Sequence, residues 1–327
     1  MLLVTPLYQS DANLQIFINS SYYRFARKKT ANLRFAGKVG LKMTQDKKGI
    51  LYMIIASTAF SLMAVMVKLS GGRIPLFEQV FFRNLVMLIF AGASLGISKT
   101  SIRVEKADRM SLFLRCLLGF LGVVTVFYAN NHLPLADAQI LQKLNPFFVI
   151  LTAVLFLGER MTSRRLVTIM AGFIGAAVII NPTGNFNLFP SLVGVSSALF
   201  GGLAYAMIRN LAGRVQGMVI IFWFSLFSIL ASAPLLMLDL VSPTVTELFY
   251  LVMIGVFAAF GQYFITKSYI TTEASKVTLY DYTGVVVSPI LGFLIFNEQL
   301  KLNTLIGTLI IIASGYLAAR LKDNQKL

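Results

Sequence analysis

Charged residues are scarce in this chain of 327 residues. Asp, Glu, Lys and Arg make up only 13% of the sequence, whereas an ordinary soluble domain has about 25%. Hydrophobic residues make up 57%, and the mean hydropathy is +0.77. The chain is long enough for two soluble domains, but it has too little polar surface to keep either one in water. Lipid must therefore cover most of it, which excludes a soluble globular protein.

Cysteine and histidine are nearly absent, with one residue of each, Cys116 and His132. A single cysteine excludes a disulfide framework, and a single histidine excludes a conventional His/Cys zinc site. The chain also lacks a G-x-x-x-x-G-K-[ST] phosphate-binding motif, a G-x-S-x-G nucleophile motif and a second deep aspartate for a protease dyad. We therefore expect no metal, no cofactor and no enzymatic activity.

Acidic residues are few, 13 against 29 Lys and Arg, so the formal net charge is +16. The cations gather in residues 1–42 and in short connections between apolar runs, which argues against a nucleic-acid partner. Membrane proteins use Lys and Arg in this way to set their orientation. We expect residues 1–48 to be a disordered basic extension or an over-long start upstream of Met43. A targeting or lipid-binding role for them stays open.

Ten apolar runs have the length of about 20 residues that a helix needs to cross a hydrocarbon core about 30 Å thick. They cover 49–69, 77–97, 110–130, 136–157, 164–180, 190–208, 217–238, 247–268, 274–296 and 303–320. The even-numbered connections and both chain ends hold most of the Lys and Arg. The positive-inside rule then predicts a multi-pass protein of the inner (plasma) membrane with both termini in the cytoplasm.

The sequence contains an internal repeat at an offset of 139 residues, in which Glu159 aligns with Glu298. Five spans separate the copies, so the second copy must cross the membrane in the opposite sense. We expect a five-helix repeat over 49–180, an inverted one over 190–320 and a cytoplasmic tail over 321–327. Inverted repeats of this kind place a substrate site near the midplane, between the halves.

Each copy ends in a helix–hinge–helix unit, "LFLGERMTSRRL" in the first and "LIFNEQLKLNTLIG" in the second. Ten spans in two such halves resemble the drug/metabolite transporter superfamily, specifically its EamA-domain proteins, over residues 49–320. "FEQVFFRN" and "LRCLLGFLG" are more loosely similar to a bacterial subgroup that includes S-adenosylmethionine uptake carriers. The resemblance implies a carrier of small metabolites and leaves substrate and direction open.

Polar residues inside the apolar runs are the site candidates, because a charge at bilayer depth is costly and commonly functional. The substrate-binding candidates are Lys143, Asp281, Tyr280, Tyr282, Gln139, Gln142 and Arg83. The repeat offset maps Gln142 onto Asp281, so the two clusters should bracket the midplane and line one cavity. Lys143 would bind an anionic group or act as the counter-ion of Asp281, and a tyrosine would contact the substrate. A purely structural ion pair is the competing interpretation.

Three further charges lie in the second and third runs. Arg83 is deep enough to face a pore, whereas Glu78 lies near the outer boundary. Asp281 and Glu78 are the candidates for carrying a coupling proton. Arg115 lies five residues from the cytoplasmic end of its run, and we expect its side chain to extend to the lipid headgroups.

The sequence therefore predicts an all-α polytopic membrane protein that moves a small metabolite by alternating access. Charges of both signs and several tyrosines favour a zwitterionic or aromatic metabolite, such as an amino acid or S-adenosylmethionine. A channel and a non-transporting scaffold or receptor are the alternatives. The expected partners are the substrate and the lipid bilayer, and a homodimer is the oligomer that we consider.

Overall fold

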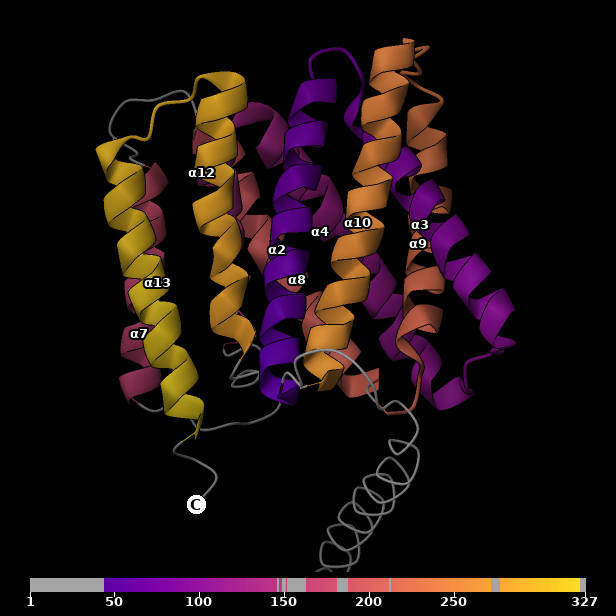
Figure 1. Cartoon of the computed structure of the whole chain (residues 1–327), viewed down its shortest axis with the longest axis horizontal. Helices are drawn as coiled ribbons and strands as arrows, with labels where there is room; N and C mark the ends of the chain where they lie inside the picture. The colour runs from indigo at the N-terminus through magenta and orange to yellow at the C-terminus, as the bar shows by residue number, and fades with distance from the viewer. Residues whose placement is uncertain are drawn as a thin grey trace, which may run out of the picture. The chain divides into compact units, whose positions relative to one another are not determined.

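A computed structural model describes residues 44–145, 147, 148, 151, 163–180, 188–211, 213–271 and 277–323. Within these residues the secondary structure is helical and contains no strand (Figure 1). The elements are α2 (Gln45–Ser70), α3 (Leu76–Ser98), η2 (Lys106–Asp108), α4 (Arg109–His132), α5 (Leu135–Gln142), α7 (Ser163–Ile180), α8 (Leu188–Leu211), α9 (Gly217–Leu236), α10 (Val245–Thr271), η3 (Thr278–Tyr282), α12 (Thr283–Phe296) and α13 (Leu302–Asp323). The predicted extension 1–48 lies outside the described residues as far as Met43.

Six of the described helices are long and apolar enough to cross a membrane: α2, α4 (with η2), and α3, α8, α9 and α10. Three shorter apolar helices lie at Leu166–Ile180, Tyr280–Phe296 and Leu302–Leu317. The chain is therefore a polytopic helical membrane protein, and the count of ten spans stays a prediction. The first helix begins earlier than the expected boundary at 49, because Thr44 caps it: the Thr44 hydroxyl accepts a hydrogen bond from the backbone N–H of Lys47 at 3.4 Å.

The fourth and ninth predicted spans are the ones that depart from regular helix. The short helix α5 gives way to a turn at Lys143 and Leu144, where the N–H groups bond to carbonyls three residues earlier. Pro146, which follows in the sequence, has no N–H to offer the carbonyl of Gln142. In the ninth span the 3₁₀ segment η3 precedes α12, so the regular helix starts only at Thr283. Interruptions of this kind within a helical segment often mark functional hinges.

The helices pack mainly as pairs that are distant in sequence: α2 with α10, α4 with α8, α3 with α9, and α7 with α13. Figure 1 shows α2 beside α10 and α13 in front of α7. Two apolar clusters form most of the core, one centred on Phe127, Phe224 and Met87 and the other on Phe147 and Leu144. The Lys143 break falls next to the second cluster, since Leu144 and Phe147 belong to it.

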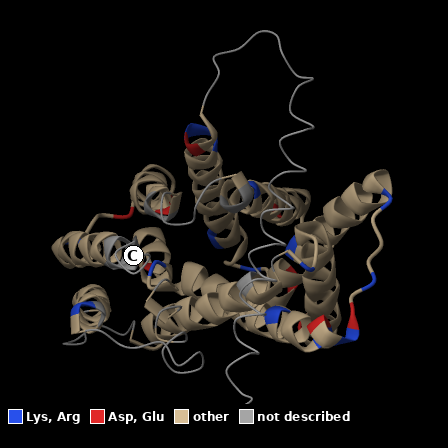
Figure 2. Cartoon of the chain, turned by 90° about the horizontal axis from the view of Figure 1, so that it is seen from below, with Lys and Arg blue, Asp and Glu red and all other residues tan. Residues whose placement is uncertain are grey.

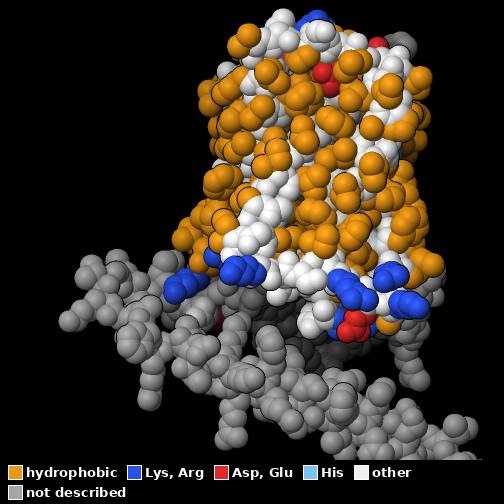
Figure 3. Space-filling view, turned by 90° about the vertical axis from the view of Figure 1, so that its right-hand side faces the viewer, with side chains coloured by type: hydrophobic (Ala, Val, Ile, Leu, Met, Phe, Trp, Pro, Cys, Tyr) orange, Lys and Arg blue, Asp and Glu red, His pale blue; other side chains and the backbone are white. Residues whose placement is uncertain are grey.

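The connections lie at two opposite ends of the bundle. We name the end that holds residues 71–75, 133–134, 237–244 and 297–301 the upper end, as it lies in Figure 1, and the end that holds 99–105 and 213–216 the lower end. Figure 2, seen from below, shows Lys and Arg mostly at helix ends and connections. Figure 3 shows a broad hydrophobic band with Lys and Arg gathered at its lower end. The surface thus has an apolar belt with unequal charge at its two ends.

Candidate functional site

Lys143 and Asp281 are brought together, which is the counter-ion arrangement, one of the two roles expected for Lys143. The Lys143 Nζ donates to Asp281 Oδ2 at 2.7 Å, and the two side chains are 11% and 29% exposed. Each residue sits at an interruption of its helix, Lys143 just after α5 and Asp281 within η3. The contact is confirmed, and a role of the pair in substrate binding stays a prediction.

Serines of α2 hold the backbone beside Asp281. The Ser57 hydroxyl donates to the Asp281 carbonyl at 2.6 Å and accepts from the N–H of Gly284 at 2.8 Å. One turn further along, Ser288 and Ser61 share a hydrogen bond of 3.1 Å between their hydroxyls. Ser57 lies at the middle of α2, so the ion pair belongs to the central part of the bundle rather than to either end. The interruption at η3 is therefore stabilised by tertiary hydrogen bonds.

The other predicted residues of this cluster lie in different surroundings. Gln139 is 4% exposed, and its amide nitrogen donates to Asn130 Oδ1 at 3.3 Å. Tyr282 is buried in the apolar cluster around Phe147, and its hydroxyl points at Gly315. Tyr280 keeps 40% of its surface exposed. Gln142 is half-buried. Lys143 and Asp281 thus form the polar centre, and the flanking residues are arranged around it.

Arg83 and Arg115 form a second charged site. Both are buried, with exposures of 3% and 5%, and both guanidiniums lie over the ring of Phe224. The expectation that Arg115 extends to the headgroups is wrong. Gly119, one turn along α4, leaves room for the guanidinium to fold back: a Cβ there would lie 2.0 Å from Arg115 Nη1. The stacking ring and this gap keep the side chain inside.

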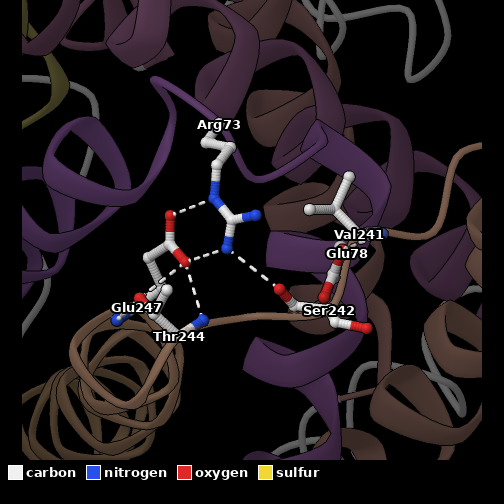
Figure 4. A network of polar contacts seen from close by, with 6 residues as sticks. All are labelled: Arg73, Glu78, Val241, Ser242, Thr244 and Glu247. Carbon is white, nitrogen blue, oxygen red and sulfur yellow. Dashed lines mark hydrogen bonds and ion pairs between the residues drawn. The ribbon is translucent and has the colours of Figure 1, made fainter.

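Glu78 is remote from Asp281 and belongs to a network at the upper end, shown in Figure 4. It is 1% exposed, and its Oε2 accepts from the N–H of Val241 at 3.3 Å. Beside it Arg73 donates to Glu247 through Nε at 2.7 Å and to the Ser242 carbonyl at 2.9 Å. The hydrogen bond to Glu247 raises the pKa of Arg73 above its ordinary value. These contacts tie the α2–α3 connection to the start of α10.

Glu298, noted in the sequence only for its place in the repeat, joins three elements at the upper end. It forms an ion pair with Lys68 near the end of α2, and its Oε2 accepts from the N–H of Leu135 at 2.8 Å. Lys68 also donates to the Leu133 carbonyl at 2.8 Å. The equivalent Glu159 lies outside the described residues. Glu298 thus links α2, α5 and the α12–α13 connection.

Asp137 is a buried carboxylate, although the sequence "NNHLPLAD" around it favours a solvated turn. Its Oδ1 accepts from the Thr304 hydroxyl at 2.7 Å, and the residue is 9% exposed. It lines a small pocket at the upper end together with Pro134, Glu298 and Lys301. Asp137 is therefore a third carboxylate in or near the spans, in addition to Asp281 and Glu78. The signal in the sequence was weak, because "LPLAD" is also typical of an exposed turn.

Comparison with known proteins identifies the family. The model of the EamA-like transporter family matches residues 47–181 and again 188–320. The chain is 33% identical over 286 residues to the pseudopaline exporter CntI of Pseudomonas aeruginosa (strain UCBPP-PA14), covering 85% of this chain and 98% of that protein. It is 27% identical over 273 residues to an S-adenosylmethionine uptake transporter of Rickettsia prowazekii, covering 81% of this chain and 90% of that protein.

Two further comparisons agree in extent and in fold. A riboflavin transporter of Brucella anthropi is 29% identical over 277 residues, covering 81% of this chain and 96% of that protein. A solved crystal structure matches 85% of this chain and 99% of its own with a TM-score of 0.60 and 20% identity, which shows a shared fold. The double match of the family model covers most of the described helices. The chain therefore belongs to the EamA-like transporter family.

Proposed function

We propose that the protein is a secondary carrier that moves a small charged metabolite across the inner (plasma) membrane by alternating access. The observation that carries the proposal is the Lys143–Asp281 ion pair at two helix interruptions, beside the middle of α2. Interrupted helices near the midplane supply both charged side chains and free backbone groups to a substrate. In this scheme Asp281 binds a cationic group or a proton, and Lys143 is released to an anionic group when the pair opens.

The packing of the helices supports two halves related by a two-fold axis. Let α2, α3, α4, α5 and α7 correspond to α8, α9, α10, α12 and α13. Exchanging the halves then turns the α2–α10 contact into α8–α4, the α3–α10 contact into α9–α4, and the α2–α12 contact into α8–α5. The α3–α9, α5–α12 and α7–α13 contacts map onto themselves. A pseudo-symmetric pattern of this kind gives two related packings of one chain, which alternating access requires.

The polar contacts at the upper end support a conformation closed on that side. Lys68 and Glu298 join α2 to the α12–α13 connection, and Glu298 also holds the start of α5. Both elements that carry the central ion pair, α5 and η3–α12, are adjacent to this link in the chain. Opening the upper end would break it, so the Lys68–Glu298 pair acts as a latch whose strength sets the balance between the two conformations.

The relatives suggest where a substrate search should start. Their names record S-adenosylmethionine, riboflavin and pseudopaline as cargo, in both inward and outward directions. A centre with one cation and one anion fits metabolites that carry both signs of charge, such as amino acids. The first panel should therefore contain S-adenosylmethionine, riboflavin and the twenty amino acids.

The test combines a thermal-shift screen of the purified protein with counterflow in proteoliposomes. A ligand at about 100 times its dissociation constant should add about 2.7 kcal/mol to the free energy of unfolding. The stabilising compound should then accumulate by counterflow in wild-type vesicles. Asp281→Asn should abolish counterflow, whereas the matched control Asp239→Asn, at an exposed carboxylate of the upper connection, should leave it intact.

Counterflow also separates the carrier from the two alternatives. A channel would give flux that does not saturate and no accumulation driven by internal substrate. A scaffold or receptor would bind a ligand without any flux. Full counterflow in Asp281→Asn would overturn the assigned role of the ion pair while leaving the carrier itself in place.

A further inference from the structure

Arg83 and Arg115 are two buried cations without an anionic partner among the residues that the structure describes. Arg83 Nη1 donates to Asn84 Oδ1 at 3.0 Å, but its Nε has no partner there. Arg115 has none for Nε or Nη1. Neither guanidinium takes part in a described ion pair, although both side chains are more than nine-tenths buried. Their hydrogen-bonding capacity is therefore largely unused.

The two guanidiniums point to one place. Their carbon atoms lie 5.7 Å and 4.5 Å from the centre of the Phe224 ring, so their separation cannot exceed the sum of these distances. Arg83 is the eighth residue of α3 and Phe224 the eighth of α9, two helices that pack on each other. The arginine pair thus lies where the two halves meet.

Helix α8 contacts both α4, which carries Arg115, and Asn145, which follows Lys143 by two positions. Tyr205 of α8 keeps 36% of its surface exposed. One turn earlier in α8, Gly201 lies against the amide of Asn145, whose Oδ1 has no described partner. Gly201 and Tyr205 share a helix face at a spacing of four residues. Tyr205 and the amide of Asn145 therefore lie on the same face of α8.

Two like charges in an apolar interior are strongly unfavourable unless an anion neutralises them. Guanidinium groups also bind carboxylate and phosphate through matched pairs of N–H donors. We infer that Arg83 and Arg115 form an oxyanion subsite, so that the cargo is a metabolite of net negative charge. This inference rests on the proposed carrier function, because it specifies the cargo of that carrier. The negative groups would bind the arginines while a cationic amine reaches Asp281.

The substrate class that fits is an amino compound with two or more carboxylate or phosphate charges. A singly charged carboxylate would leave one guanidinium uncompensated. A cargo of net positive charge would add to the repulsion. Acidic amino acids and larger amino polycarboxylates are therefore favoured over S-adenosylmethionine and riboflavin from the first panel.

The test uses citrate and inorganic phosphate as probes on the purified full-length protein, with chloride at equal ionic strength as the reference. Citrate, phosphate or both should raise the thermal midpoint of the wild type, and the stronger probe tells carboxylate from phosphate chemistry. Arg115→Gln and Arg83→Gln should each weaken the apparent affinity at least about tenfold, because each removes charged hydrogen bonds. The control Arg103→Gln, at an exposed arginine of the lower connection, should leave the affinity unchanged.

Two further readouts separate a binding role from a structural one. Without an oxyanion, Arg115→Gln should keep or raise the thermal midpoint, because it removes an unpaired buried charge. Gly119→Ala keeps the charge but displaces Arg115 Nη1, and it should weaken probe binding as well. If Arg115→Gln instead lowers the midpoint in chloride while probe binding persists, the arginines are packing residues and the inference is wrong.

The experiment tests the oxyanion subsite separately from the proposed carrier function. If neither probe stabilises the wild type more than chloride while Asp281-dependent counterflow is intact, the carrier stands and the oxyanion subsite is refuted. If the probes bind through the arginines but no compound shows counterflow, the subsite stands and the proposed carrier function fails.

Discussion

Asp281 is held at both of its polar ends, since its carboxylate accepts from Lys143 at 2.7 Å and its backbone carbonyl accepts from Ser57 at 2.6 Å. The first contact joins the two interrupted helices, and the second joins one of them to the middle of α2. Movement of η3 would break or reorient both bonds. A change in the charge of the ion pair can therefore alter the packing of both halves.

The double variant Lys143→Gln with Asp281→Asn separates structural from functional roles of the pair. Removing one partner should lower the free energy of unfolding by about 2 kcal/mol, less than for a fully buried pair because both groups keep some access to water. The double variant should recover most of this loss, since no unpaired charge remains. Thermal unfolding in detergent measures the first effect and counterflow the second. Recovery of transport together with stability would show that the pair only holds the halves together.

Close approach of α12 to α2 should depend on Gly284. A Cβ at this position would lie 2.8 Å from Ser57 Oγ and 3.2 Å from Ser61 Oγ, so Gly284→Ala forces the helices or the serines to move. We expect a loss of about 1–3 kcal/mol in the free energy of unfolding and a lower transport rate. Gly96→Ala is the control, because nothing lies within 4 Å of its added carbon. It should be neutral or stabilising by up to about 1 kcal/mol, and equal losses at the two sites would contradict the packing argument.

Weakening the upper latch should make that end more accessible. Glu298→Gln removes the ion pair with Lys68 and weakens the bond to the N–H of Leu135. A cysteine in place of Ala136, which lines the neighbouring pocket and is 6% exposed, should then react several-fold faster with a membrane-impermeant maleimide. The native Cys116 is buried and should give little background. Glu105→Gln, at an exposed site of the lower end, is the control, and an unchanged labelling rate in Glu298→Gln would refute the latch.

The helices were largely predictable, because the length of the apolar runs and the positions of helix-breaking residues determine where they begin and end. The runs 77–97 and 217–238 agree with α3 and α9 to within two residues at each end. The ion pair of Lys143 with Asp281 was one of two roles expected for Lys143, because the repeat offset places the two clusters at near-equivalent positions. These features depend on composition along the chain, and a single sequence contains that information.

The features that could not be predicted depend on residues from distant helices. Neither proline nor glycine occurs within the 3₁₀ segment η3, so its own residues do not indicate a break in the helix. The segment is stabilised by Ser57, which lies more than two hundred residues away in the sequence. The inward fold of Arg115 needs the ring of Phe224 as well as Gly119 in its own helix. Counting residues from the end of the span placed the Arg115 side chain at the lipid interface. That rule assumes that the side chain is extended and faces outward.

Orientation is the last prediction, and it follows from the unequal charge of the two ends. The lower connection 99–105 holds Lys99 and Arg103, whereas the upper connection 237–244 holds no cation and one carboxylate, Asp239. The positive-inside rule then places the lower end in the cytoplasm. In intact cells an impermeant maleimide should label Asp239→Cys and spare Ser101→Cys, both at exposed positions. Inside-out vesicles should give the reverse pattern. Labelling of Ser101→Cys in intact cells would place the lower end outside, and the Lys68–Glu298 latch would then close the cytoplasmic side of the carrier.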